Sequence, residues 1–211
     1  MKTHLIDPIH KLDPAVSGAQ ALLIRHAKRE PILSADTVWD ARLTDEGRLD
    51  AQSFGAALAP FSFGGAFASP IPRCMETAAL ILDGWGHPQK TVQSDWFLLN
   101  AYVRDKAAVK AQFEVHDSDQ LVLDHVAGMP LDGFFSPQEG SKRLLREIAM
   151  RMAPDALTLF VSHDALLMPL YAHYFGARFS KATWFPCLHG AVISKSDSGI
   201  CIDGALVTGR E

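Results

Sequence analysis

The sequence lacks any apolar run long enough to cross a membrane as a helix, which would take about 20 consecutive apolar residues. It also lacks the apolar core of a signal peptide near its start, because residues 1–20 are polar and interrupted by Pro8 and Pro14. These two absences predict a cytoplasmic protein with no membrane partner. A long basic run is missing as well, and the formal net charge of −4 argues against nucleic acid as a partner.

Cysteine is scarce, and the usual metal and nucleotide motifs are absent. The three cysteines, Cys74, Cys187 and Cys201, are odd in number and widely spaced, which excludes a disulfide framework and a zinc pattern. They are expected to be free thiols in a reducing compartment. There is no glycine-rich phosphate loop, no Asp-x-Asp pair at a strand end and no His-x-x-x-His pair with a carboxylate. The sequence therefore predicts neither a metal nor a cofactor.

The remaining features are typical of one soluble α/β domain. The chain has 211 residues, of which 48% are hydrophobic and 21% are charged. Two short apolar runs, residues 21–24 and 157–161, read as buried parallel strands. Helices are predicted after Thr44, which can cap the first of them, then from Pro72, over 106–115, after the Ser-Pro-Gln-Glu capping box at 136–139, and over 165–175. A hairpin over 190–202 closes the chain.

Charged and imidazole side chains follow each apolar run at once. Arg25, His26 and Arg29 come after the first run, and His163 with Asp164 after the second. Ligands bind beyond the carboxyl ends of the strands in open α/β sheets, so these groups are expected at the mouth of one pocket. Such a set of cations suits an anion, and phosphate is the obvious candidate.

Arg73 points to the same chemistry. It falls in the first turn of a predicted helix, where backbone N–H groups favour an anion and a cation gains nothing from the helix dipole. The charge of Arg73 could lower the pKa of the neighbouring Cys74 and make its thiol reactive, but the Cys-x5-Arg loop of a cysteine phosphatase is missing.

Four segments, in this order, resemble motifs of the histidine phosphatase superfamily. Residues 25–31 resemble the Arg-His-Gly-x-Arg-x-Pro signature of its acid phosphatase branch, with Ala27 in place of Gly. Residues 43–51 resemble Leu-Thr-x-x-Gly-x-x-x-Ala, and residues 69–78 resemble Ser-Pro-x-x-Arg-x-x-x-Thr-Ala. Residues 162–164 resemble the second histidine motif, with the His-Asp pair of the acid phosphatase branch.

The resemblance implies a phosphoglycerate mutase-like fold, which is a three-layer α/β/α sandwich with a mostly parallel central sheet. Residues 1–211 would form a single domain, in which residues 95–135 are a substrate-cap insertion. The oligomeric state cannot be read from the sequence.

The resemblance also implies a metal-independent phosphatase that hydrolyses a small-molecule phosphomonoester. His26 would attack phosphorus to give a phosphohistidine, and nearby guanidinium groups would help to keep it neutral. Phosphate would be bound by four side chains, Arg25, Arg29, Arg73 and His163, the last of which also counts among the catalytic residues. Asp164 would donate the proton to the leaving group.

Three alternatives stay open at this point. A protein phosphohistidine phosphatase would need less help from Asp164, because its leaving group departs as an amine. A phosphomutase would return the phosphoryl group from His26 to its substrate, although no segment for binding a mutase's substrate carboxylate is recognisable. A non-catalytic phospho-ligand-binding protein is disfavoured, because it has no need of His26, His163 and Asp164 together.

Overall fold

The computed structural model describes residues 8–12, 18–32, 39–196 and 199–209 of the chain, and its centre is a seven-stranded sheet in these residues. The strand order is β3-β2-β4-β1-β5-β6-β7. The strands are β1 (Ala19–Arg25), β2 (Phe63–Ala68), β3 (Gln93–Ser94), β4 (Leu157–Ser162), β5 (Gly190–Ser196), β6 (Gly199–Ile202) and β7 (Ala205–Gly209). β3, β2, β4 and β1 run parallel, whereas β5, β6 and β7 are joined antiparallel. The central strands are thus parallel as predicted, and the closing hairpin continues the sheet antiparallel to β1.

Both faces of β1 are buried, which explains why its sequence shows no polar alternation. Leu22 and Ile24 contribute to the core on one side of the sheet, and Ala21 and Leu23 to the core on the other. A strand buried on both faces reads as a continuous apolar run.

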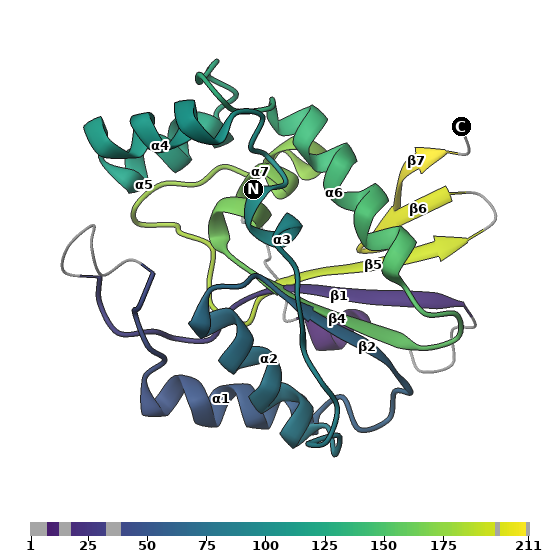
Figure 1. The fold of residues 1–211 in the computed structure, drawn as a ribbon. Helices are drawn as coiled ribbons and strands as arrows, with labels where there is room; N and C mark the ends of the chain where they lie inside the picture. Colours follow the sequence, from purple (N-terminus) through teal and green to yellow (C-terminus); the bar gives the residue numbers. More distant parts are fainter. Residues whose placement is uncertain (1–7, 13–17, 33–38, 197–198, 210–211) are drawn as a thin grey trace.

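Helices cover both faces, so the predicted three-layer α/β/α architecture is confirmed (Figure 1). α1 (Asp45–Ala56) and α2 (Pro72–Gly84) pack on one face. α3 (Phe97–Asn100), α6 (Pro137–Arg151) and α7 (Asp164–Phe175) pack on the other. α1 and α2 approach so closely that a Cβ at Gly55 would lie 2.1 Å from the Ile81 carbonyl oxygen.

The predicted helix starts and stops are confirmed by their capping contacts. The Thr44 side chain accepts a hydrogen bond from the Gly47 N–H at 3.0 Å. Ser136 and Glu139 form the reciprocal capping box that opens α6. Gly176 ends α7 with φ of 62°, in the left-handed region that glycine adopts without strain.

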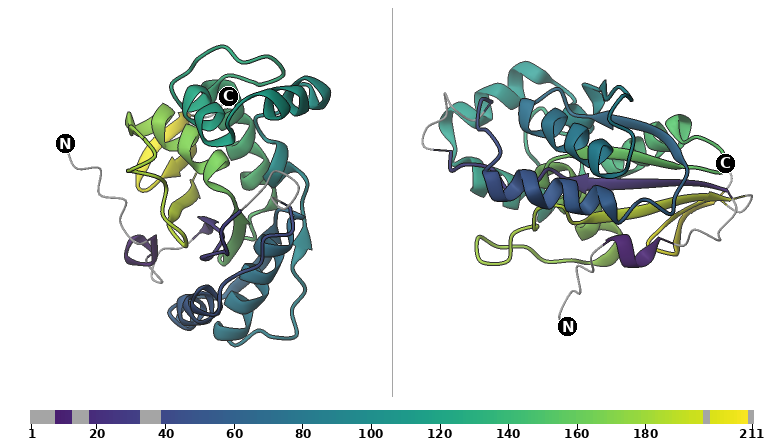
Figure 2. Two further views of the ribbon diagram at one scale, coloured as in Figure 1. Left: turned by 90° about the vertical axis from the view of Figure 1, so that its left-hand side faces the viewer. Right: turned by 90° about the horizontal axis from the view of Figure 1, so that it is seen from below.

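Two further helices, α4 (Lys106–Val115) and α5 (Ser118–Val126), lie within the 95–135 region. The left view of Figure 2 looks toward the carboxyl ends of the parallel strands, with α1 and α2 below the sheet and α4 and α5 above it. Residues 121–123, which form a short apolar run in the sequence, belong to α5.

Residues 1–18, which precede β1, lie partly outside the described residues. Among them, a 3-10 turn at Pro8–Lys11 contacts β5. No helix in the described part of the chain is both long enough and apolar enough to cross a membrane.

Candidate active site

The pairing of β1 with β4 brings the two histidine motifs together. Arg25 lies opposite Ser162 in the parallel register, and the His26 N–H donates to the Ser162 carbonyl oxygen at 2.9 Å. His26, which follows β1, and His163, which follows β4, therefore leave the sheet side by side. Their ring centroids are 5.5 Å apart in an edge-to-face arrangement.

His26 is buried in an orientation that leaves one ring nitrogen ready to accept a proton or bond to phosphorus. Its Nδ1 lies 2.7 Å from the Ala27 carbonyl oxygen, which can only accept a hydrogen bond. Nδ1 thus carries the hydrogen, and the lone pair is on Nε2, which accepts from Arg73 Nε at 3.1 Å. Burial, together with the nearby His163, Arg25 and Arg73, holds the pKa of His26 well below its ordinary value. The imidazole is therefore neutral near neutral pH.

Arg73 stands between the two histidines. Pro72 occupies the first turn of α2, and the Arg73 side chain that follows is buried. Besides its bond to His26, it places Nη2 3.4 Å from His163 Nδ1. A cation buried in the first turn of a helix is unfavourable by itself, because the helix dipole is positive there. Its position therefore fits the binding of an anion.

His163 is also buried and neutral. Because arginine can only donate, Nδ1 of His163 accepts from Arg73, which leaves Nε2–H to donate to Ser69 Oγ at 3.0 Å. Burial and the charge of Arg73 lower the pKa of His163 to about 3. This ring can offer an N–H group at the site but not a full positive charge.

Asp164, the first residue of α7, is held by three donors. Its Oδ2 accepts from Arg25 Nη2 at 2.7 Å and from the Trp184 indole N–H at 2.8 Å, and its Oδ1 accepts from the Ala165 N–H at 2.8 Å. Burial acts to raise the pKa of Asp164, but Arg25 and Trp184 outweigh it and lower this pKa to about 2. In this arrangement Asp164 is a carboxylate and has no proton to give.

Arg25 connects the strand end to the segment 176–189, which follows α7. Its Nη1 donates to the Phe185 carbonyl oxygen, while its Nη2 is paired with Asp164. Its Nε is buried and has no hydrogen-bond partner among the described residues. Arg25 thus has one buried donor that none of the described residues satisfies.

Arg29 lies at the edge of this cluster. Its Nη1 donates to the backbone carbonyl oxygen of its neighbour Glu30 at 2.9 Å, and its backbone forms an isolated antiparallel bridge with Leu43. Burial lowers the pKa of Arg29, and the charge of Arg25 lowers it further, whereas Asp164 opposes this effect. The structure thus brings Arg25, His26, Arg73, His163 and Asp164 into direct contact and places Arg29 beside them.

The thiol of Cys74 faces the cluster but is poorly suited to catalysis. It lies 3.5 Å from His163 Nε2 and is completely buried. Burial raises the pKa of Cys74 to about 12, although Arg73 acts in the opposite direction. Since the thiolate is the reactive form, this cysteine is inert.

Several side chains that support the site were not singled out from the sequence. Thr77 accepts from the Ala27 N–H at 3.1 Å and donates to the Arg73 carbonyl oxygen at 2.7 Å, so it ties the two motifs together. Ser69 and Thr77 both lie within the motif over 69–78, which was the available signal. Nothing in the sequence marked Trp184 or Phe185, because segment 176–189 carries no motif.

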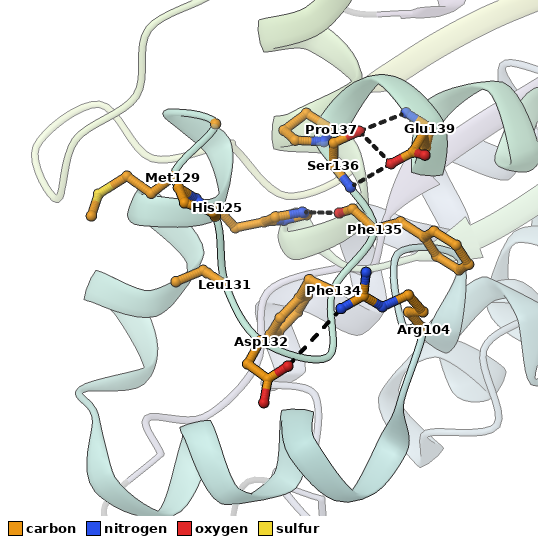
Figure 3. A pocket seen from close by; sticks show the side chains of 12 residues that line it. Arg104, His125, Met129, Leu131, Asp132, Phe134, Phe135, Ser136, Pro137 and Glu139 are labelled. Atoms are coloured by element: carbon orange, nitrogen blue, oxygen red, sulfur yellow. Dashed lines mark hydrogen bonds and ion pairs between the residues drawn. The ribbon is translucent and has the colours of Figure 1, made fainter.

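A separate cavity of about 420 Å³ lies in the 95–135 region and extends into the start of α6. Figure 3 shows Arg104, His125 and Phe134 among the residues that line it. His125 contacts the Phe135 carbonyl oxygen through Nε2 at 2.9 Å, and burial lowers its pKa. The cavity is lined by none of the predicted site residues, so it is distinct from the charged cluster.

Comparisons with known proteins agree with this geometry. Residues 21–96 match the family model described as "Histidine phosphatase superfamily (branch 1)". The match ends before His163 and Asp164, so the predicted leaning toward the acid phosphatase branch stays a prediction. A comparison with curated proteins finds no match.

Solved structures share the fold at low sequence identity. YhfR of Bacillus stearothermophilus superimposes with a TM-score of 0.57 at 18% identity, covering 89% of this chain and 98% of that one. A phosphoglycerate mutase from Bacillus anthracis gives 0.53 at 17%, with 93% and 94% covered. A mycobacterial glucosyl-3-phosphoglycerate phosphatase in complex with inorganic phosphate gives 0.56 at 16%, with 90% and 98% covered. The predicted phosphoglycerate mutase-like fold is thereby confirmed.

Proposed function

Since residues 21–96 match the histidine phosphatase superfamily and the described chain has the phosphoglycerate mutase-like fold, we propose that this protein hydrolyses a small-molecule phosphomonoester through a phosphohistidine on His26. The observation that carries the proposal is the state of His26. It is a buried, neutral imidazole whose Nδ1–H is anchored to Ala27, so the lone pair of Nε2 is directed at the guanidinium of Arg73. A phosphoryl group bound by that guanidinium would lie within reach of the nucleophile.

Binding of the phosphoryl group falls to Arg25, Arg29, Arg73 and His163. Phosphoryl transfer is catalysed mainly by positioning and by neutralising the charge on the equatorial oxygens. Three guanidinium groups can supply this charge, and each can donate two parallel hydrogen bonds to a phosphate. The neutral His163 would add a donor without adding charge, because its Nε2–H can pass from Ser69 to a phosphate oxygen.

The reaction proceeds in two displacements. In the first, Nε2 of His26 forms a bond to phosphorus while the bond from phosphorus to the ester oxygen breaks, and Asp164 delivers a proton to that oxygen. In the second, water attacks the phosphohistidine, Asp164 takes a proton from the water, and the bond between Nε2 and phosphorus breaks. Inorganic phosphate is then released, and His26 returns to the neutral imidazole.

Substrate selection is assigned to residues 95–135 as a cap on the domain. This assignment is supported by Asp119 at the start of α5, whose charge acts to raise the pKa of Arg29. The expected partner is a small phosphorylated molecule. A neighbour of the same fold is named glucosyl-3-phosphoglycerate phosphatase, which is consistent with such a substrate class.

One observation favours a second candidate. Asp164 is a carboxylate in this structure, and a phosphoramidate leaving group needs less acid than an alkoxide does. A protein phosphohistidine phosphatase on the same fold would therefore rely less on Asp164. Comparing hydrolysis of a phosphohistidine peptide with that of alkyl phosphates separates the two functions.

The direct test is release of inorganic phosphate from a panel of small phosphomonoesters, measured with and without a chelator. We expect at least one alkyl phosphate to be turned over, with the same rate in both conditions. Absence of turnover with every ester, or loss of turnover on chelation, would contradict the proposed function.

A further inference from the structure

On one edge of the Arg25 guanidinium, one nitrogen is hydrogen-bonded and the other is not. The guanidinium is planar, and Nε–H and Nη2 lie along the same edge as a fork of parallel donors. In this structure Nη2 is paired with Asp164, whereas the buried Nε has no hydrogen-bond partner among the described residues. The opposite nitrogen, Nη1, is held by the Phe185 carbonyl oxygen. A single carboxylate oxygen thus takes one of two donors that could act together.

Phosphate suits this edge better than Asp164 does. Two phosphate oxygens match a two-donor guanidinium edge, and such bidentate pairs are the strong ones. A phosphate that took Nε together with the Nη2 hydrogen that now pairs with Asp164 would satisfy the buried donor and displace Oδ2 of Asp164. Phe185 would keep the guanidinium plane in place through Nη1, so the exchange requires no large movement of Arg25.

We infer that Arg25 exchanges Asp164 for the phosphoryl group of the substrate, and that Asp164 takes up a proton from solvent as it loses this ion pair. The inference rests on the proposed function and explains how a carboxylate becomes a proton donor. The proton is bound at Oδ2, the oxygen that Arg25 leaves. It later passes to the ester oxygen as that oxygen separates from phosphorus.

The surroundings of Asp164 set the direction of this change. Arg25 is the strongest influence opposing burial, and a phosphate dianion on the guanidinium would cancel much of its charge. Burial would then dominate and raise the pKa of Asp164. The other titratable or charged groups that interact with Asp164 are Arg29, Arg73, His26, His163, Cys74 and Cys187.

Trp184 acts as a positioning residue in this exchange. Its indole N–H can only donate, and it binds the same Oδ2 that Arg25 leaves. Together with the Ala165 N–H on Oδ1, it would hold the carboxyl group in place after the ion pair is lost. The acid would thus be protonated only when a phosphoryl group is bound.

Calorimetric titration with inorganic phosphate tests the exchange without relying on turnover. Binding heats measured in two buffers of different ionisation enthalpy give the number of protons taken up per phosphate bound. The variants are wild type, Asp164→Asn and the control Asp203→Asn. Asp203 is a matched control because it is also partly buried and paired with a cation, Lys11, at 2.6 Å, in the turn between β6 and β7. Measurements are made at several values between about pH 5 and pH 7.

We expect wild type and Asp203→Asn to take up close to one proton more per phosphate than Asp164→Asn does, at the lower end of this range. By linkage, phosphate affinity in wild type then falls up to tenfold more per pH unit than in Asp164→Asn as the pH rises. Equal proton uptake in wild type and Asp164→Asn would overturn the exchange and leave the proposed function standing. No binding of phosphate to any of the three would overturn the proposed phosphate site, and the exchange with it.

Discussion

The strand ends of β1 and β4 and the segment 176–189 contribute to the same site in different ways. The strand ends supply His26, His163 and Asp164, each placed by a motif that is visible in the sequence. The segment supplies Trp184 and the carbonyl of Phe185, which touch Asp164 and Arg25. The motifs specify which groups take part in the chemistry, whereas the segment helps to set their protonation and orientation.

The same difference separates the nucleophile from the acid. His26 is already in its reactive form, because burial and neighbouring cations keep it neutral. Asp164 is in the wrong form for donating a proton, because Arg25 and Trp184 stabilise its carboxylate. Under the proposed function, the site is therefore prepared for attack on phosphorus, and it needs a bound substrate to protonate the acid.

The largest effect on the rate is expected from removing the nucleophile itself. His26→Ala should reduce hydrolysis of every phosphomonoester by more than about a thousandfold, because it removes the imidazole whose Nε2 lone pair would attack phosphorus. The matched control is His10→Ala, which alters an exposed histidine in the 3-10 turn before β1 and should leave the rate unchanged. Steady-state phosphate release measures both, with circular dichroism to check folding. A rate for His26→Ala within tenfold of wild type would contradict its role.

Removing the acid should affect substrates unequally. Asp164→Asn should slow hydrolysis of alkyl phosphates by about a hundredfold to ten-thousandfold, which is the usual range for general acid catalysis. Hydrolysis of an activated aryl phosphate should fall far less, since that leaving group departs without a proton. The measurement is kcat for both substrates in both proteins. Equal losses on the two would remove Asp164 as the proton donor.

The contribution of segment 176–189 is tested by removing one hydrogen bond. Trp184→Phe keeps an aromatic ring but loses the donor to Asp164, and this should slow alkyl phosphate hydrolysis by about tenfold. Because that bond stabilises the carboxylate, the pKa of Asp164 should rise in the variant. Carbon NMR titration of the Asp164 carboxyl group measures this change. An unchanged pKa would show that the segment does not set the charge of the acid.

The smallest effect is expected where the segment meets the 95–135 region. Lys181 pairs with Asp117, the N-cap of α5, at 3.1 Å, and both side chains are well exposed. Exposed ion pairs contribute little, so Lys181→Ala should leave the denaturant midpoint of unfolding nearly unchanged. Chemical denaturation measures this, and kcat should stay within about twofold of wild type. A larger change in kcat would mean that this contact holds the substrate cap.

The fold and the meeting of charged and imidazole groups at the strand ends could be predicted because their signals are local. The apolar runs before Arg25 and His163 indicated buried strands, and Thr44 and Ser136 marked helix starts through their own capping contacts. Trp184 could not be predicted in this way, because its role depends on where the segment after α7 folds back over β1. Nor could the charge of Asp164 be predicted, since burial raises its pKa and the Arg25 ion pair lowers it. Which effect is stronger depends on the depth of burial and on the distance between the two side chains, and neither can be read from the sequence.

The most direct test of the account is to trap the covalent intermediate. Asp164→Asn, mixed with an activated aryl phosphate and quenched in alkali, should carry one phosphoryl group on the peptide that contains His26. That group should be lost in acid, as expected for a phosphoramidate bond, and should be absent in the His26→Ala protein. Label on another residue, such as Cys74, or turnover of the aryl phosphate with no trapped label under any quench time, would contradict phosphoryl transfer through His26.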